Sequence, residues 1–277
     1  MGSEQELEFL LEKAADLVVN SKKIVVFTGA GISTESGIPD FRSPGGIWTR
    51  YDPEMFTIQK FLYDPEARKM HWKLLGGDEF MKFDAQPNPA HYAVAELDKM
   101  GKLDCVITQN VDMLHEKGGV PPDKVIHLHG NMERAKCLKC GKYYPMTEVR
   151  KWIAQGAEVP DCPACGGLIK PDAVFFGEAM PVWETSEAQR RAQSCDLCIV
   201  IGSSLVVYPA ALMPQYAVQS GARLIIVNRD ATELDRVADV CIHASAGETM
   251  SKLIKRVKEK IATHTSKGTL HRQKGKA

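Results

Sequence analysis

Short apolar runs alternate with amphipathic stretches along the chain, which is the pattern of an α/β protein. The apolar runs are rich in β-branched residues and end in a glycine or a polar residue, as the buried strands of a parallel sheet do. The expected strands cover residues 23–28, 103–108, 125–129, 169–176, 197–201, 223–227 and 239–242. Helical periodicity predicts helices over residues 4–20, 88–100, 181–194, 209–219 and 247–262. The pattern therefore predicts a Rossmann-like parallel sheet with helices on both faces.

Two segments interrupt this alternation and form a predicted smaller domain. Residues 45–85 have no strand pattern, so we expect a helical insertion that is either a binding module or a packing insert. Residues 131–170 carry two cysteine pairs and predict a zinc ribbon-like module. The expected Rossmann-like domain comprises residues 1–44, 86–130 and 171–262. Residues 263–277 are basic and polar without apolar periodicity, so we expect a disordered tail.

A glycine-rich turn follows the first expected strand. Gly29 and Gly31 let the backbone turn tightly and let a ligand approach the main chain. A helix beginning near Ser33 would direct free N–H groups at an anion, which favours a dinucleotide pyrophosphate site. Because Thr34 stands at the third glycine position of the usual fingerprint, a packing role for the glycines stays open. The loop 39–42 combines a proline, a carboxylate, an aromatic ring and an arginine, which favours the nucleotide interpretation.

Polar side chains follow three of the expected strands. Gln109, Asn110 and Asp112 come directly after strand 103–108, and a helix cap would explain only Asp112. The carboxyl ends of parallel strands meet at one edge of a sheet, so we interpret these side chains as ligand contacts. The residues expected at a phosphate or ribose after the later strands are Gly202, Ser203, Ser204, Asn228 and Asp230.

Two imidazoles alternate along the expected strand 125–129. The alternation points His127 and His129 the same way. We expect His127 to be a core histidine with internal partners. His129 stands at the strand end before Gly130, where a metal ligand, a catalytic base and a packing residue are all open interpretations.

Two Cys-x-x-Cys pairs, each followed by glycine, are the strongest local motif. Their four thiols are Cys137, Cys140, Cys162 and Cys165. Four thiolates complete the tetrahedral coordination of Zn²⁺, so the expected metal is structural, and a redox disulfide pair is the alternative. A third pair, Cys195 and Cys198, lacks the glycine, and we interpret both residues as core thiols.

Composition excludes several classes of protein. The 277 residues include 35 Lys and Arg against 35 Asp and Glu, so the net charge of zero predicts no bulk attraction to nucleic acid or membranes. The longest apolar runs fall short of the roughly 20 residues of a membrane span. The acidic, amphipathic N-terminus does not match a secretory signal. Cysteines in metal-type pairs favour a reducing compartment, so we expect a cytoplasmic protein.

Several of these motifs occur together, and in order, in a known family. They are Gly29-Ala30-Gly31-Ile32-Ser33, Gly37-Ile38-Pro39-Asp40-Phe41-Arg42, Thr108-Gln109-Asn110-Val111-Asp112, His129-Gly130, the four paired cysteines and Gly202-Ser203-Ser204-Leu205. Over about residues 10–260 the chain resembles the sirtuins, NAD-dependent protein-lysine deacetylases and deacylases, in their prokaryotic form. The resemblance implies NAD, one structural Zn²⁺, and an acyl-lysine peptide bound as an extended strand. Ser203 departs from the threonine common in the family but keeps the hydroxyl.

The resemblance also implies roles for individual residues. His129 would be the catalytic base, and Asn110 would meet the nicotinamide ribose. The residues implied in cofactor binding are Ala30, Gly31, Thr34, Asp40, Phe41, Arg42, Gln109, Asn110, Val111, Asp112, His129, Gly202, Ser203, Ser204, Asn228, Asp230 and Cys241. Those implied in binding the substrate peptide are Val174, Phe176, Gly177, Leu205, Val206 and Val207. The implied zinc ligands are Cys137, Cys140, Cys162 and Cys165.

The implied reaction transfers the acyl group of lysine to ADP-ribose and releases nicotinamide. The acyl oxygen attacks C1′ of the ribose, a step that needs charge stabilisation and exclusion of water. His129 then takes a proton from a ribose hydroxyl, which suits a group with a pKa near neutrality. Family members that prefer succinyl or malonyl lysine carry Tyr-x-x-Arg in the helical insert, where this chain has Trp72-Lys73-Leu74-Leu75. We therefore expect neutral acyl groups, acetyl first.

Two other functions fit parts of the sequence. An NAD-dependent mono-ADP-ribosyltransferase would use the same cofactor site with an arginine or water as the nucleophile. A nucleic-acid-binding zinc protein is disfavoured, because no basic stripe surrounds the cysteines. We expect neither a membrane nor nucleic acid as a direct partner.

Overall fold

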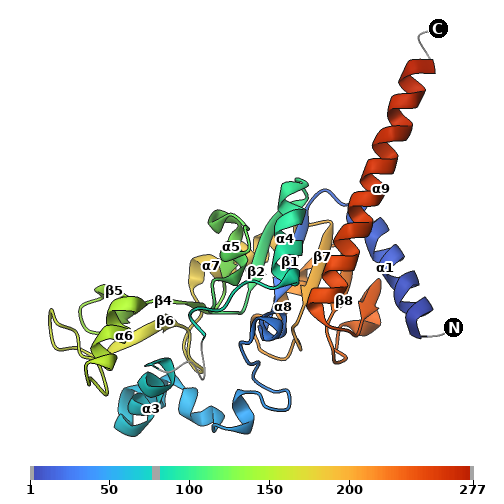
Figure 1. Cartoon of the computed structure of the whole chain (residues 1–277). Helices are drawn as coiled ribbons and strands as arrows, with labels where there is room; N and C mark the ends of the chain where they lie inside the picture. The colour runs from blue at the N-terminus through green and yellow to red at the C-terminus, as the bar shows by residue number, and fades with distance from the viewer. Residues whose placement is uncertain (1–2, 77–81, 275–277) are drawn as a thin grey trace.

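The structure is a computed structural model that describes residues 3–76 and 82–274, and it confirms the predicted α/β fold. The strands of the central sheet are β1 (Ile24–Thr28), β2 (Leu103–Thr108), β3 (Val125–His127), β7 (Leu197–Ile201), β8 (Arg223–Val227) and β9 (Val240–Ile242). They form a six-stranded parallel sheet in the order β3-β2-β1-β7-β8-β9 (Figure 1). The strand order reverses between β1 and β7, and such a reversal opens a ligand crevice at the carboxyl ends of the two strands.

Helices cover both faces of this sheet. They are α1 (Ser3–Asn20), α4 (Pro89–Lys99), α5 (Leu114–Lys117), α7 (Val182–Ala192), α8 (Leu212–Gln219) and α9 (Ala246–Lys274). Ile24 and Val26 of β1 pack with α1, α4 and α9, whereas Val25 and Phe27 pack on the opposite face with α7 and α8. Because side chains alternate between faces, a strand covered on both sides must be apolar at every position. This double coverage explains the unbroken apolar runs of the sequence.

The two insertions share one apolar cluster beside the sheet. Their strands are β4 (Gly130–Cys137), β5 (Tyr143–Pro145) and β6 (Ile169–Ala173), which form an antiparallel sheet in the order β5-β4-β6, and their helices are α2 (Ile58–Tyr63), α3 (Pro65–Gly76) and α6 (Met146–Ala154). Trp72 and Leu75 of α3 pack with Met132, Val149 and Ile169 of the cysteine-containing segment. The helical insertion therefore completes the core of the second insertion.

Several features of the strands and the turns differ from the sequence analysis. The sequence did not predict β4, because the exposed Glu133 and Arg134 interrupt its apolar positions. The predicted strand 169–176 ends at Ala173 and pairs antiparallel with β4 as β6, so it does not belong to the parallel sheet. The predicted strand 125–129 ends at His127. Short 3₁₀ helices complete the described structure: η1 (Ala30–Ser36), η2 (Ile47–Thr49), η3 (Pro53–Phe56), η4 (Pro122–Lys124) and η5 (Asp235–Val237).

The last helix is longer than predicted. The sequence predicted a helix over 247–262 and a disordered tail over 263–277, but α9 continues to Lys274 and projects away from the body of the protein (Figure 1). Residues 263–274 contain no proline, and their lysines, arginine and glutamine have good helix propensity, so nothing ends the helix at residue 262. Residues 275–277 lie outside the described residues. None of the helices in the described ranges is both long and apolar enough to span a membrane.

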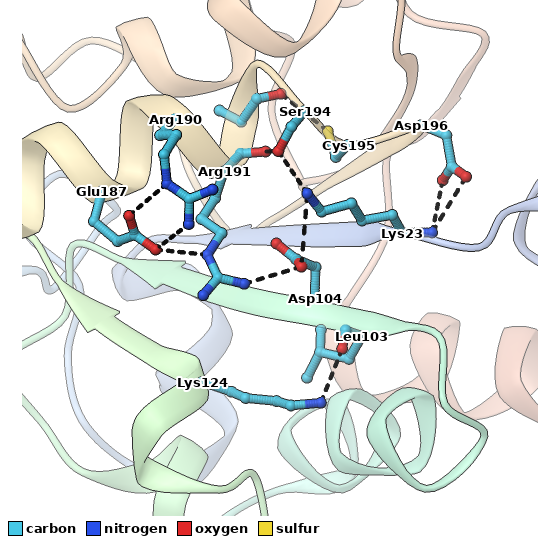
Figure 2. A network of polar contacts seen from close by, with 11 residues as sticks. Lys23, Leu103, Asp104, Lys124, Glu187, Arg190, Arg191, Ser194, Cys195 and Asp196 are labelled. Atoms are coloured by element: carbon cyan, nitrogen blue, oxygen red, sulfur yellow. Dashed lines mark hydrogen bonds and ion pairs between the residues drawn. The ribbon is translucent and has the colours of Figure 1, made fainter.

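A network of charged side chains fastens α7 to the amino ends of β1 and β2 (Figure 2). Arg191 Nη1 donates to Asp104 Oδ1 at 3.0 Å, and Arg191 Nε donates to Glu187 Oε1 at 2.7 Å. The main-chain N–H of Lys23 donates to Asp196 Oδ1 at 3.1 Å. The network lies at the opposite end of the strands from the crevice, so we assign it to holding the sheet and α7 together.

Candidate active site

A cavity of about 480 Å³ lies at the carboxyl ends of β1, β2, β7 and β8 and extends to the smaller domain. All the residues implied in cofactor or substrate binding line this cavity, apart from Cys241. They come from five segments that are far apart in the sequence: 30–42, 109–112, 129, 174–177 and 202–230. The parallel sheet brings most of these segments together, because β1, β2, β7 and β8 each deliver the following loop to the same edge. Segment 174–177 instead follows β6 of the smaller sheet.

Cys241 is the exception. It lies on β9, and its thiol donates to the main-chain oxygen of Asp235 at 3.6 Å. It packs with the apolar cluster on the α7 and α8 face, while Ala244 and Ala246, just beyond the strand, line the cavity instead. The alternation of side chains along β9 therefore excludes Cys241 from the cavity wall. We correct its predicted place in the site accordingly.

Backbone packing requires the glycines of the turn after β1. The N–H of Gly31 donates to the carbonyl of Gly202 at 2.9 Å, and a Cβ on Gly31 would lie 2.8 Å from Gly202. Gly202 has a φ of +61°, and its Cβ would lie 2.2 Å from the main-chain nitrogen of Ile32. The packing role that the sequence left open is therefore correct, although both loops also line the cavity. The turn continues as η1 from Ala30, with Gly29 as its N-cap, rather than as the helix expected from Ser33.

Ser33, Asn110 and Asp112 form a buried hydrogen-bonded cluster in the cavity wall. Ser33 Oγ donates to Asp112 Oδ2 at 2.9 Å and lies 3.1 Å from the donating Nδ2 of Asn110. Asp112 Oδ1 accepts from the main-chain N–H of Leu114 at 3.0 Å, so the residue holds the turn that leads into α5 and also faces the cavity. Burial raises the pKa of Asp112, and the hydrogen bonds from Leu114 and Ser33 oppose that shift. No sequence motif had assigned Ser33 this bridging position.

His129 follows β3 and faces the cavity. Its Nδ1 lies 3.0 Å from the main-chain carbonyl of Gln109, which can only accept, so Nδ1 carries the proton and Nε2 is the basic nitrogen. The side-chain amide of Gln109 donates to Ser203 Oγ at 2.9 Å and joins this loop to the loop after β7. Burial lowers the pKa of His129. A neutral imidazole in a fixed tautomer is suited to act as a general base.

Asp40 shapes the loop that follows the glycine turn. Its Oδ1 accepts from the main-chain N–H of Ser43 at 2.8 Å, and its Oδ2 accepts from Ser43 Oγ at 2.5 Å. The ring of Phe41, in this turn, lies 5.1 Å from the ring of Trp48, and Trp48 lies 5.9 Å from Phe176. Asp40 therefore fixes the turn that carries Phe41. Through Trp48, this ring is connected to Phe176 in the loop implied in peptide binding.

Two loops implied in peptide binding face the same cavity. Phe176 already uses both main-chain groups: its N–H donates to Phe56 at 3.1 Å, and its carbonyl accepts from Ile58 at 2.9 Å. The N–H of Val174 donates to the main-chain carbonyl of His129 at 2.8 Å. On the other loop, Leu205 has a φ of +57°, which is uncommon for a residue with a side chain. A peptide strand would therefore have to pair with the remaining main-chain groups of these loops.

The end of the cavity within the smaller domain is mainly apolar. Leu74 and Leu75 of α3 line it together with Phe56, Met132 and His71. Burial lowers the pKa of His71 to about 4, so its imidazole is neutral there. Trp72, named in the sequence comparison, is fully buried in the shared core instead. In the described ranges α3 gives the wall no cationic side chain.

The four paired cysteines meet at the base of the smaller sheet. Their Sγ atoms all lie within 4.8 Å of one another, with 3.5 Å between Cys137 and Cys165 and 3.7 Å between Cys140 and Cys162. Sulfurs around a tetrahedral Zn²⁺ at about 2.3 Å are separated by about 3.8 Å, so the donor set fits zinc. All eight cysteines are free thiols, which gives the redox-disulfide alternative no support. The cluster contains no histidine, so His129 is not one of these candidate ligands.

Sequence reasoning missed part of the cavity wall. The missed residues include Ser33, Trp48, Phe56, His71, Met132 and Tyr208. The apolar members carry no motif, and the spacing of Trp48, Phe56 and His71 in short helices is typical of ordinary core packing. Only Ser33 had a signal, since it stands in the glycine turn whose other members were assigned.

The fold and the cavity define a Rossmann-type nucleotide-binding protein with an inserted metal-type cysteine module. A family model described as the Sir2 family matches residues 29–209. The chain is 46% identical to NAD-dependent protein deacetylase 1 of Pyrobaculum aerophilum, over 90% of this chain and 95% of the relative. The chain belongs to the Sir2 family.

Solved structures of Sir2 proteins share the whole architecture. One contains a deacetylated p53 peptide and 3′-O-acetyl ADP-ribose; it is 41% identical, has a TM-score of 0.82, and the match covers 90% of this chain and 97% of that one. Another contains a p53 peptide and NAD⁺; it is 40% identical, has a TM-score of 0.79, and the match covers 92% and 98% of the two chains.

Proposed function

We propose that the protein is an NAD-dependent protein-lysine deacylase that prefers acetyl groups and transfers them to ADP-ribose with release of nicotinamide. The carrying observation is that His129, a neutral imidazole oriented by a carbonyl, faces the same cavity as the Ser33, Asn110 and Asp112 cluster. The Sir2 structures with NAD⁺ and peptide, and with acetyl ADP-ribose and deacetylated peptide, support this function. They favour it over ADP-ribosylation of a protein.

The residues present fit NAD along the crevice. Thr34 and Arg42 would hold the pyrophosphate at the end of β1, next to the loop that Asp40 fixes. Ser204 and Asn228 would meet the adenosine half after β7 and β8. Asn110 would meet the nicotinamide ribose, and the Asp112 carboxylate would accept a hydrogen bond from the nicotinamide amide. The remaining residues proposed at the cofactor are Ala30, Gly31, Phe41, Gln109, Val111, Gly202, Ser203 and Asp230.

The proposed mechanism assigns separate tasks to the side chains. When bound, NAD supplies an electrophilic ribose carbon and nicotinamide as its leaving group. The Nε2 atom of His129 takes a proton from a ribose hydroxyl, because Nδ1 already donates its hydrogen to the carbonyl of Gln109. Asn110 orients the ribose, and Ser33 fixes the rotamer of Asn110. Phe41 and Trp48 cover the site and exclude water from the reacting atoms.

The proposal is tested by mass spectrometry of the protein incubated with NAD and one acetyl-lysine peptide. Equal amounts of nicotinamide, deacetylated peptide and acetylated ADP-ribose are expected. Free ADP-ribose, or ADP-ribose attached to protein, without peptide deacetylation would instead contradict the proposal. Omitting the peptide gives the background rate of NAD cleavage.

We propose that the substrate peptide binds as an extended strand between the loops 174–177 and 205–207. Both loops line the cavity, and the exposed Phe176 and Val206 flank it. Main-chain pairing would supply affinity with little dependence on peptide sequence. A cytoplasmic location is a further proposal, supported by eight free cysteines, because a reducing compartment keeps thiols free.

Acetyl-lysine should be removed faster than succinyl-lysine. The apolar wall of Leu74, Leu75 and Met132 offers no cation from α3 to a succinyl carboxylate, so the buried charge would remain unpaired. We expect at least a tenfold difference in kcat/KM, equivalent to about 1.4 kcal/mol. The measurement compares acetyl and succinyl forms of one peptide, and butyryl as a neutral control of similar length. Faster removal of succinyl than butyryl would reject the predicted preference.

A further inference from the structure

His127 is a buried imidazole that the proposed mechanism leaves without a task. It ends β3, two residues before His129, and 13% of its side chain is exposed. Its Nε2 lies 2.7 Å from Oε1 of Glu116 on α5, and its Nδ1 lies 3.4 Å from the main-chain carbonyl of Asn110. The predicted internal partners of His127 therefore exist, and one of them belongs to the loop that follows β2.

The two partners select the cationic form of the ring. An ionised carboxylate and a carbonyl can only accept hydrogen bonds, so a neutral imidazole with one N–H would satisfy only one of them. Burial lowers the pKa of His127, but the hydrogen bond and charge of Glu116 outweigh it and raise the pKa above 6.5. Asp112 adds a second carboxylate nearby, and burial keeps the adjacent His115 neutral by lowering its pKa. The pKa of His127 is thus shifted in the opposite direction to the pKa of His129.

The carboxylate of Glu116 has no other hydrogen-bond partner in the described part of the chain. Its Oε2 is buried and unpaired, and 13% of its side chain is exposed. A buried carboxylate that lost its only partner would be costly, so Glu116 and His127 hold each other in place. The ion pair therefore fixes the orientation of the His127 ring, and with it the position of Nδ1.

The Nδ1 atom of His127 contacts the main chain of Asn110. His127 approaches the Asn110 carbonyl, and His129 approaches the preceding carbonyl, that of Gln109. Two histidines two positions apart therefore hold consecutive carbonyls of one loop. The Asn110 side chain is held separately by Ser33, so the residue is fixed at both its main chain and its amide.

We propose that His127, anchored by Glu116, is a positioning residue that fixes the main chain of Asn110 and thereby places the Asn110 amide for the nicotinamide ribose. This inference rests on the proposed function, because it assumes that NAD occupies the cavity. His127 itself does not line the cavity, so it acts through Asn110. Its effect should appear in NAD binding and not in peptide binding.

Two double variants test the contact of His127 with Asn110 independently of its contact with Glu116. Asparagine at 127 places its amide nitrogen near the position of Nδ1, and glutamine places it near Nε2. Both variants carry Glu116→Gln, so neither leaves a buried carboxylate without its partner. E116Q/H127N can still donate to Asn110, whereas E116Q/H127Q keeps only the contact with residue 116.

We expect E116Q/H127N to bind NAD within about twofold of the wild type. E116Q/H127Q should bind NAD about five- to tenfold more weakly, with the KM for NAD rising in parallel and the KM for peptide unchanged. Calorimetry gives the NAD affinity directly, and the melting temperature reports any folding cost common to both variants. The single variants His127→Asn and His127→Gln repeat the comparison if the double variants do not fold.

Equal NAD affinities in the two variants would overturn the positioning role, as would a matching rise in the KM for peptide. If His127 had a purely structural role, both double variants would melt at lower temperatures than the wild type, and their NAD affinities would be equal. The wild type distinguishes this failure from failure of the proposed function. If the wild type neither binds NAD nor consumes it with acetyl peptide, the proposed function fails and this inference fails with it.

Discussion

Replacing His129 by alanine is expected to lower the rate of peptide deacylation by roughly 10²- to 10⁴-fold, the usual contribution of a general base. NAD should still bind with nearly wild-type affinity, because Ser33, Asn110 and Asp112 are held by one another and not by the His129 ring. Nicotinamide release with acetyl peptide measures the rate, and calorimetry measures NAD binding.

His264→Ala is a matched control for the loss of an imidazole, because residue 264 lies on α9, which projects away from the body of the protein (Figure 1). It should retain full turnover. Full turnover by His129→Ala would remove the base from the mechanism. Loss of NAD binding in that variant would instead show that His129 supports the shape of the cavity.

The same group sets an expectation for pH dependence. Because burial lowers the pKa of His129, the neutral base predominates above a value that lies below 6.5. Activity should therefore fall on the acid side only as the pH drops through this lowered pKa. A profile of kcat/KM from pH 5 to 8 checks the prediction, because kcat/KM reports the pKa values of the free enzyme, and an acid limb centred above 6.5 would contradict it.

Removal of the proposed zinc is expected to lower the rate of deacylation as strongly as the loss of His129 does. The cause would be unfolding of the smaller domain and not loss of a catalytic group. Cys162→Ser, or treatment with a strong chelator, should abolish deacylation because the four thiols hold β4 and β6 together at one end. Structural zinc sites of this kind contribute on the order of 10 kcal/mol to folding of their module. Metal analysis should show one zinc per chain, and circular dichroism should show that the parallel sheet survives its loss.

Cys195→Ser is the matched control. The Cys195 thiol donates to the carbonyl of Ala192 at 3.2 Å, which a serine hydroxyl can also do, and the residue lies outside the four-cysteine cluster. Zinc content and activity should both be retained. An active Cys162→Ser variant without bound metal would contradict a structural role for zinc.

The sequence predicts the central sheet well because its two middle strands, β1 and β7, are buried at every position, and β2 and β8 are buried at all but one. It predicts the cysteine cluster for a similar reason, since metal ligation fixes both residue type and spacing. It misses β4, because the pairing with β6 shifts register between Gly130 and Ala135 and the buried Met132 and Ala135 do not alternate as in a regular strand. It also misses the continuation of α9, where no proline marks an end of the helix.

Only part of the candidate site can be predicted from the sequence, as with the fold. Gln109, Asn110 and His129 can be identified because they end buried strands, where polar residues are conspicuous. Asp40 and Gly31 are assigned to the cofactor from sequence, yet their visible contacts are with the chain itself. The bridge through Ser33 depends on a meeting of two loops, which no local pattern encodes.

The free end of α9 offers a natural point of attachment. At 1.5 Å per residue, the helix after Ala262 extends about 18 Å before it reaches Lys274. A fluorophore or a surface anchor joined beyond that residue would stand clear of the substrate entrance. The enzyme can therefore be immobilised through the far end of α9 and assayed with large protein substrates without steric interference.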